Sequence, residues 1–284
     1  MNLPLLRVGS GEPELWVVAG VHGDEVEGIA CVEEALAKIC PLRGTLIGVP
    51  VANPPALYAG ARFGPDGLDL NRAYPGRPDG QPTERLAHEL CSPLLRGASA
   101  LLTLHSWSRQ GVTTSYVEYA RGDAVGRALA RALGIRFVEA WDWPDGLLPK
   151  VCVAAGIPAV EVEIGGLGRH TREGLQIGIG AIRSAAEWLG LLDGGDTRGC
   201  VEVTRHWLEA TTAARVHQLL GVGQAVRAGD VVCELRRLDG SACAHVTTPA
   251  SGWMATHLTY GWANRGERIA VVFQSASNKT PTTG

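Results

Sequence analysis

The stretch that decides the fold of this chain is Leu15-Trp16-Val17-Val18-Ala19-Gly20-Val21-His22-Gly23-Asp24-Glu25. Its first five residues form a short apolar run with branched and aromatic side chains, which predicts a buried β-strand. The two glycines allow a tight exit from that strand, so we expect a helix to begin near Asp24. A strand-to-helix corner of this kind is typical of an open α/β fold.

The same stretch places two potential metal ligands side by side. His22 and Glu25 are three residues apart, and at this corner the spacing aims both side chains at one point beyond the carboxyl end of the sheet. A third ligand and an open position would complete a catalytic zinc centre. Taken alone, the residues also fit a plain helix start, in which Asp24 caps the helix and Glu25 complements its dipole. The zinc interpretation therefore needs partners elsewhere.

The composition is that of a globular protein with a small-molecule partner. The 284 residues are 45% hydrophobic and 19% charged, which allows one sizeable core and a smaller module. A formal charge of -3 without a basic tract argues against nucleic-acid and anionic-membrane partners. The first residues do not resemble a signal peptide and no apolar run is long enough to span a membrane, so we expect a cytoplasmic protein. Seven scattered cysteines predict reduced, mostly buried thiols.

Apolar runs alternate with helical segments from Leu15 to about Leu192, which predicts an α/β domain with a mixed, largely parallel sheet flanked by helices. The expected strands cover residues 15–19, 45–51, 100–104, 114–119, 137–140 and 159–163. The expected helices cover residues 25–39, 83–95, 123–133 and 171–189. The interval from 53 to 82 fits neither period and is crowded with Pro, Gly, Asp, Asn and Arg, which indicates a long structured loop with a function.

A linker rich in Gly and Asp follows Leu191 and Leu192. We therefore expect a catalytic domain over residues 1–195, a β-rich module over 196–275 and a polar tail over 276–284.

Two similar stretches of the module, residues 222–232 and 260–270, resemble the halves of a biotinyl/lipoyl-type β-barrel. Such domains carry a cofactor on a lysine, but this chain has no lysine between Lys150 and Lys279. The module is expected either to pack beside the active site or to build a homo-oligomer.

The third ligand is expected at the end of another strand. Among eight histidines, His22 and His105 are the two that directly follow apolar runs, where a ligand at the carboxyl edge of the sheet must stand. For His105 alone, a core histidine with satisfied hydrogen bonds is the alternative.

Two acids on an otherwise apolar strand provide a candidate general base. Glu161 and Glu163 point to the same face of that strand, and a buried carboxylate needs a compensating interaction. Glu163 lies nearer the carboxyl end, so it is assigned as the base, whereas Glu161 is left to support a ligand or to form an ion pair. A charge pair at a sheet edge is the alternative.

The most specific stretch of the chain is Gly64-Pro65-Asp66-Gly67-Leu68-Asp69-Leu70-Asn71-Arg72-Ala73-Tyr74-Pro75-Gly76. An arginine next to an asparagine in a loop fixed by Pro and Gly can hold a carboxylate with a two-pronged guanidinium and an amide. A solvated surface loop is the alternative, which the crowding of ordered-turn residues disfavours. We therefore expect a small-molecule substrate that carries a carboxylate.

Together these segments resemble the succinylglutamate desuccinylase and aspartoacylase family, a branch of the zinc carboxypeptidase-like fold. The resemblance runs from about Leu15 to Gly168, and it rests on motifs in family order: Gly-Val-His22-Gly-Asp-Glu25, Arg62, Asp69-Leu-Asn71-Arg72-Ala-Tyr-Pro-Gly76, Leu-His105 and Glu163-Ile-Gly165.

The resemblance implies one zinc ion per chain, held by His22, Glu25 and His105. It also implies Arg62 as a group that helps to polarise the scissile carbonyl, Asn71 with Arg72 as the clamp on a substrate carboxylate, and Glu163 as the catalytic glutamate.

Two positions depart from the family pattern, of which Tyr74 in place of a usual phenylalanine is expected to be harmless. Members usually have Asp two residues before the third ligand, and here that residue is Thr103. Loss of an acid that orients a ligand lowers metal affinity by about 10–100-fold, which puts metal occupancy in question. The run from Ser106 to Gln110 matches no family pattern, so we expect it to influence substrate specificity.

From these motifs we expect zinc-dependent hydrolysis of an amide bond that removes an acyl group from an N-acyl amino acid or a related small amine, with Glu163 as the base. A zinc carboxypeptidase acting on short peptides is the nearest alternative, because the same groups serve both reactions. A small-molecule binding protein with impaired catalysis is a third possibility, which Thr103 favours and the intact ligands disfavour.

Overall fold

The computed structural model describes residues 3–194, 199–259 and 261–278. Its internal contacts divide the chain into two compact units. The first unit comprises residues 1–109 and 115–200, and the second comprises 110–114 and 201–284. The domain boundary expected after residue 195 lies outside the described residues, as does most of the expected tail.

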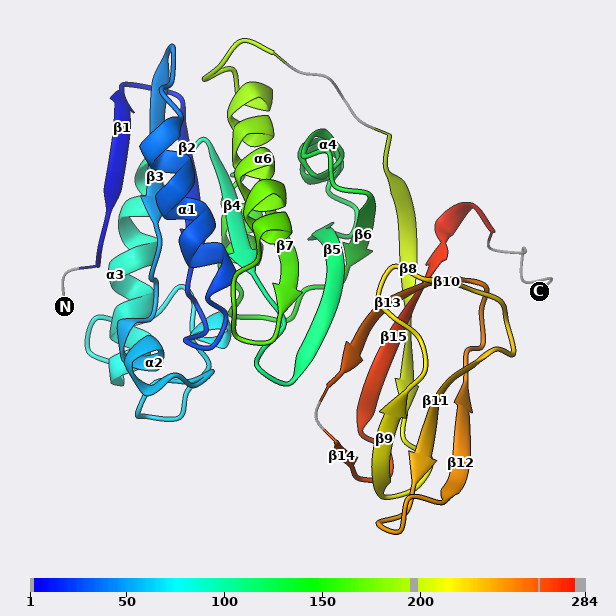
Figure 1. The fold of residues 1–284 in the computed structure, drawn as a ribbon. Coiled ribbons are helices and arrows are strands. Elements are labelled where there is room, and N and C mark those ends of the chain that lie inside the picture. The colour runs from blue at the N-terminus through cyan, green and yellow to red at the C-terminus, as the bar shows by residue number, and fades with distance from the viewer. Residues whose placement is uncertain (1–2, 195–198, 260, 279–284) are drawn as a thin grey trace. The chain divides into compact units, whose positions relative to one another are not determined.

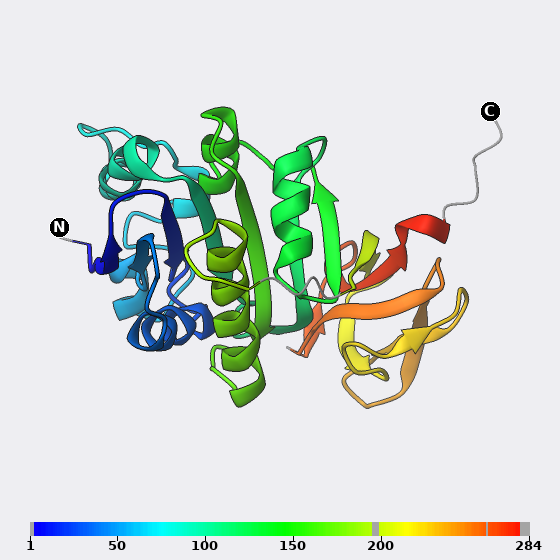
Figure 2. The same cartoon turned by 90° about the horizontal axis from the view of Figure 1, so that it is seen from above.

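A sheet with helices on both faces forms the first unit (Figures 1 and 2). Its strands are β1 (Leu6–Ser10), β2 (Glu14–Ala19), β3 (Gly44–Val49), β4 (Ala100–His105), β5 (Gly111–Ala120), β6 (Phe137–Trp141) and β7 (Ala159–Gly166). They follow the order β1-β3-β2-β4-β7-β5-β6. The pairs β2–β3, β2–β4, β4–β7 and β5–β6 are parallel, whereas β1 runs antiparallel to β3.

Six helices accompany this sheet in the described residues: α1 (Glu27–Lys38), α2 (Pro54–Ala59), α3 (Pro82–Gly97), α4 (Ala124–Ala132), α5 (Leu148–Ala154) and α6 (Arg172–Trp188). The apolar faces of α1, α4 and α6 join one buried cluster, and those of α3 and α5 join a second. Alternate residues of β2 and β4 contribute to the two clusters, because successive side chains of a strand point to opposite faces. The sheet is therefore buried on both sides.

The expected α/β class is confirmed, and each of the six expected strands and four expected helices has a counterpart. α1 begins at Glu27, later than expected, because residues 20–26 form the corner itself. The short elements β1, α2 and α5 were not expected from the sequence. Within the interval 53–82, α2 and the single 3₁₀ turn η1 (Leu70–Arg72) supply the order that its turn residues indicated.

Antiparallel strands build the second unit: β8 (Val201–Glu209), β9 (Ala214–Gln218), β10 (Ala225–Val226), β11 (Val231–Arg236), β12 (Ala242–Thr247), β13 (Gly252–Leu258), β14 (Trp262–Ala263) and β15 (Arg268–Ser275). β8, β15, β13 and β10 are neighbours in that order, and β12, β11, β9 and β14 form a separate sheet. Residues 111–113, at the start of β5, pair with β13. The small hydrophobic core of the second unit includes Leu235, Met254 and Val272.

The two similar stretches of this unit form similar turns. Between β10 and β11, the backbone N–H of Arg227 donates to the side chain of Asp230, and between β14 and β15 the N–H of Asn264 donates to that of Glu267. A glycine with positive φ precedes each acid, at +90° in Gly229 and +83° in Gly266. The half-repeat of the sequence is therefore also a repeat of structure. A likeness to the biotinyl/lipoyl barrel remains a prediction.

Two further expectations concern the state of the cysteines and the presence of a membrane-spanning segment. All seven cysteines are free, and four of them are buried. Within the described ranges, no helix is long and apolar enough to cross a membrane.

Gly23 lets the corner after β2 approach the backbone of α2. A Cβ atom at this position would lie 2.0 Å from the carbonyl carbon of Ala56 and 2.3 Å from the nitrogen of Leu57. Both neighbours are backbone atoms of a helix and cannot turn aside. Only glycine therefore fits between His22 and Asp24.

We predict that Gly23→Ala lowers the free energy of unfolding by about 1–3 kcal/mol, because the added methyl group overpacks this contact. The matched control is Gly180→Ala in α6, where the added Cβ meets nothing within 4 Å. That change is expected to stabilise the chain by about 0.4–1 kcal/mol. Urea denaturation measures both, and equal stability of the two variants would contradict the close approach.

Candidate metal centre

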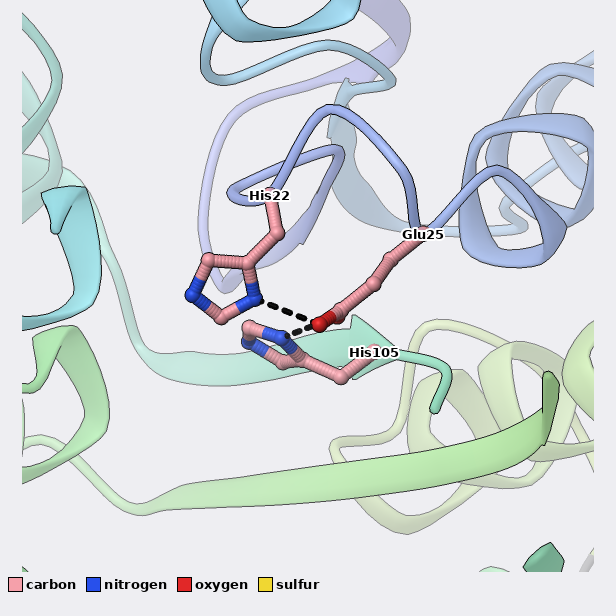
Figure 3. A group of neighbouring side chains, drawn as sticks. All are labelled: His22, Glu25 and His105. Atoms are coloured by element: carbon pink, nitrogen blue, oxygen red, sulfur yellow. Dashed lines mark hydrogen bonds and ion pairs between the residues drawn. The ribbon is translucent and has the colours of Figure 1, made fainter. Parts of the chain in front are cut away.

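Three predicted ligands converge at the carboxyl edge of the first unit's sheet (Figure 3). His22 Nδ1 lies 2.7 Å from Glu25 Oε1, and His105 Nδ1 lies 2.9 Å from Glu25 Oε2. One potential ligand atom from each residue falls within 4.8 Å of the others. All three are buried, with exposed fractions of 2%, 4% and 2% for His22, Glu25 and His105. They form a closed cluster of two imidazoles and one carboxylate.

Parallel pairing of β2 with β4 brings the cluster together. Ala19 at the end of β2 lies opposite Leu104, so His105 comes directly beside the corner that follows Ala19. That corner turns at Gly20 and is closed by a hydrogen bond from the backbone N–H of Glu25 to the carbonyl of His22. Glu25 therefore stands just before α1, with its carboxylate bonded to both rings (Figure 3).

Each imidazole has a second carboxylate near its other nitrogen. His22 Nε2 lies 3.1 Å from Asp69 Oδ1, and His105 Nε2 lies 3.4 Å from Glu161 Oε2. A carboxylate at this position fixes the tautomer and orientation of a metal-binding histidine and raises its basicity. The sequence placed Asp69 within the family motif but gave it no role of its own.

Opposite charges hold the cluster in its ionised form. Burial opposes the charge on Glu25, yet the two imidazoles outweigh it and hold the pKa of that carboxyl well below its usual range. Burial lowers the pKa of His105, but the carboxylates of Glu161 and Glu25 raise it to about 10. The pKa of His22 is likewise raised by Glu25 and Asp69 against the effect of burial.

Glu163 lies beside the cluster, and its pKa is shifted in the opposite direction to that of Glu25. Its partner in the β4–β7 register is His105, so both side chains occupy the same end and face of the sheet. Burial and the negative charge of Glu25 raise the pKa of Glu163 well above its usual value, and His105 only partly offsets them. Its Oε2 is buried without a hydrogen-bond partner among the described residues. A carboxyl with a raised pKa suits proton transfer near neutral pH.

Arg62 also reaches the cluster. Its guanidinium donates to Glu25 Oε1 at 3.3 Å and to Asp69 Oδ2 at 3.1 Å, and the side chain remains 38% exposed. It thus links the predicted ligand Glu25 to Asp69, the carboxylate near His22 Nε2, and it remains partly exposed to solvent.

Asn71 and Arg72 lie in η1 and have no hydrogen bond to His22, Glu25 or His105 in the described parts of the chain. Asn71 is buried, its backbone N–H donates to Asp69 Oδ1, and its Oδ1 lacks a described partner. The Arg72 guanidinium donates to the carbonyl of Asn71. Among the hydrogen bonds of the described residues, those to Asp69 connect this pair to the cluster.

Asn53 connects the interval 53–82 to the corner that carries His22 and Glu25, and it was not expected from the sequence to have this role. Its Oδ1 accepts from the N–H of Ala56 and caps α2, while its Nδ2 donates to the carbonyl of Val21 at 3.2 Å. The residue next to Val21 is His22. An Asn directly before Pro54-Pro55 is a recognisable helix cap, but its second bond depends on tertiary structure.

The chemistry of the donor set fits zinc. Two neutral imidazole nitrogens and one carboxylate are the ligands of a catalytic zinc site that leaves a position open for water or substrate. Here they are buried, face one another, and each ring is backed by a further carboxylate. Such carboxylates orient metal-binding histidines and raise their basicity, so they also favour a metal at this site.

Comparison with known proteins identifies the family. Residues 12–187 match the model of the succinylglutamate desuccinylase/aspartoacylase catalytic domain. This chain belongs to that family. The match spans strands β2 to β7, the His-Glu-His cluster and the interval 53–82, and it supports a hydrolase that acts on amide bonds.

Relatives extend the likeness over nearly the whole chain. The chain is 28% identical to the N-alpha-acetyl-L-2,4-diaminobutyric acid deacetylase of Halomonas elongata, over 95% of this chain and 85% of that protein. A succinylglutamate desuccinylase/aspartoacylase from Rhodobacter sphaeroides is similar in structure, with a TM-score of 0.86, 25% identity and coverage of 97% and 90%. The product-bound ectoine utilization protein of Ruegeria pomeroyi has a TM-score of 0.88, 24% identity and coverage of 96% and 89%, which shows the shared fold.

We predict that Asn53→Asp lowers the free energy of unfolding by about 1–3 kcal/mol. The variant keeps the cap on α2 but loses the donor to Val21, leaving a buried carbonyl opposite a carboxylate. Asp123→Asn provides the reverse exchange at the exposed cap of α4, where either side chain accepts the N–H of Val125. It is expected to change stability by less than about 0.5 kcal/mol. Urea denaturation measures the free energy of unfolding of both variants. If both differ from the parent by the same small amount, the hydrogen bond from Asn53 to Val21 contributes nothing to stability.

Proposed function

We propose that this chain is a zinc-dependent amidohydrolase that removes an acyl group from an N-acyl amino acid or a related small amine. The observation that carries the proposal is the buried His22-Glu25-His105 cluster with Glu163 beside it. In this proposal the cluster holds one zinc ion per chain and Glu163 is the general base.

The deacetylase relative supports deacylation as the reaction. By its name, that protein removes an acetyl group from the α-nitrogen of an amino acid, and its likeness covers both units of this chain. The same groups would also serve a carboxypeptidase, in which the leaving amine belongs to a peptide's C-terminal residue. The two reactions therefore differ in the fragment that leaves, and a substrate panel separates them.

In the proposed mechanism, zinc supplies a Lewis acid that lowers the pKa of water from about 15.7 toward about 7. The Glu163 carboxylate accepts the proton of the attacking water and, as the carboxylic acid, returns it to the leaving amine. Its raised pKa suits this double role, because a group that both takes and gives a proton works best near the operating pH.

Arg62 is assigned to the oxygen of the scissile carbonyl. Its side chain is 38% exposed, and the bonds to Glu25 and Asp69 hold the guanidinium in place, so it need not be reoriented as negative charge develops. Asn71 and Arg72 are assigned to a substrate carboxylate. The Asn71 amide nitrogen and the planar guanidinium of Arg72 can donate to that carboxylate. The Asn71 amide oxygen, which has no hydrogen-bond partner in the described residues, can accept from a donor of the same substrate.

We predict that Glu163→Gln lowers kcat for the best N-acyl substrate by about 10²–10⁴-fold while zinc content stays at one ion per chain. The amide matches the carboxyl in shape but cannot accept the proton. The control is Glu139→Gln, at a buried glutamate of β6, which is expected to retain parental kcat. Elemental analysis and steady-state kinetics give both quantities. Equal turnover of a zinc-loaded parent and Glu163→Gln would show that the base is another group.

We predict that the zinc-loaded protein hydrolyses N-acyl amino acids in preference to dipeptides. A panel of N-acetyl and N-succinyl amino acids, the matching α-carboxamides and dipeptides measures kcat/KM for each class. Blocking the α-carboxylate is expected to lower kcat/KM by about 10–100-fold, because a charge-assisted hydrogen bond is lost. Cleavage of dipeptides alone would replace the deacylase proposal with the carboxypeptidase.

A further inference from the structure

We propose that Glu161 is the positioning residue for His105, holding the ring so that its Nδ1 faces the metal. The inference rests on the proposed function, because it takes His105 as a zinc ligand. It assigns to β7 two different acids: Glu163 for proton transfer and Glu161 for orientation of a ligand.

The contacts of Glu161 support this role. Its Oε2 lies 3.4 Å from His105 Nε2, and the same oxygen lies 3.4 Å from the hydroxyl of Thr103, which donates to it. Glu161 is 6% exposed and Thr103 is 1% exposed, so water does not compete strongly at this position. The carboxylate therefore bridges two residues of β4 from the neighbouring strand.

The rest of the His105 ring shows why this contact matters. Its Nδ1 is directed to Glu25, and Nε2 is buried with no hydrogen bond that meets normal limits among the described residues. Within those residues, Glu161 is the only carboxylate that forms an ion pair with Nε2. His22 has the corresponding arrangement with Asp69, at 3.1 Å. Each of the two rings thus has a carboxylate near its Nε2 atom. A small shift that shortens and aligns the 3.4 Å contact between Glu161 Oε2 and His105 Nε2 would make it a full hydrogen bond.

The strand register explains how position 161 can do this. Thr103 and Glu161 are direct partners on parallel strands, and His105 and Glu163 are the next pair on the same face. Side chains of directly paired residues lie close together and share their surroundings. An acid at either position 103 or position 161 therefore has access to the space behind His105. This chain has the acid on β7 and a short hydroxyl residue on β4.

The uncharged Thr103 thus does not leave His105 without an acid. Its hydroxyl supports the carboxylate of Glu161 instead of replacing it. The loss of metal affinity that Thr103 suggested from sequence is not expected.

The test moves the acid between the two strands and measures zinc affinity. The parent, Glu161→Thr and the double variant Thr103→Asp/Glu161→Thr are titrated with Zn²⁺ against a chromophoric chelator. Glu161→Thr is expected to weaken zinc binding by about 10–100-fold, as loss of a carboxylate behind a ligand does. The double variant is expected to recover affinity to within about threefold of the parent. A purely structural role of Glu161 would not be rescued by an acid at 103.

Glu139→Thr is the matched control, since Glu139 is a buried glutamate of β6 outside the cluster. It is expected to leave zinc affinity unchanged, and circular dichroism verifies folding of every variant. If Glu161→Thr does not fold, Glu161→Gln is used, and an affinity loss of at least threefold is expected because the charge on the acceptor is lost.

The outcomes separate the two proposals. A parent that binds zinc and hydrolyses N-acyl substrates, while Glu161→Thr retains parental affinity, overturns the role of Glu161 alone. Failure of the acid at 103 to restore affinity also overturns it. A folded parent that binds no zinc overturns the proposed function, and this inference with it.

Discussion

The buried carboxylate of Glu25 is the group on which the arrangement of the site depends. A buried charge without partners is costly, so its oxygens must be satisfied from nearby segments. They contact the two imidazoles, the guanidinium of Arg62 and the backbone N–H of Ser106, which donates at 3.3 Å. These partners come from the corner after β2, the interval 53–82 and the end of β4. One carboxylate thereby fixes three parts of the chain that are distant in sequence.

An excess of acids over fixed cations surrounds this carboxylate. Asp69, Glu161 and Glu163 stand near it, whereas Arg62 is the one guanidinium that bonds to it in the described residues. These acids raise the pKa of His105 to about 10 against the effect of burial. At Glu163 burial raises the pKa well above its usual range, and the neighbouring negative charges raise it further. A cationic ligand among these acids would relieve the repulsion, which agrees with a metal as the proposed occupant.

The interval 53–82 gains its order from a few hydrogen bonds of its polar side chains as well as from α2 and η1. Asn53 ties its beginning to the ligand corner, and Asp66 accepts from both the N–H and the hydroxyl of Thr83 at the start of α3. Asp69 lies between these anchors and reaches Arg62, His22 and the N–H of Asn71. The loop therefore behaves as part of the site, since its short polar side chains bond to fixed backbone at both ends.

By itself the sequence determined the α/β class and the main strands and helices, because hydrophobic periodicity and helix-stopping glycines are local properties of the chain. It also brought out His22, Glu25 and His105, since each stands where an apolar run meets the carboxyl edge of a sheet. The sequence did not predict the short elements β1, α2 and α5, because so few residues show too weak a hydrophobic period. Only the tertiary structure decided which acid stands behind which histidine. Asp69 and Glu161 reach His22 and His105 through a folded loop and the register of β4 with β7, and neither is encoded in residue spacing. Cross-strand register depends on packing of the whole sheet, so the support of the site emerges only when the chain is folded.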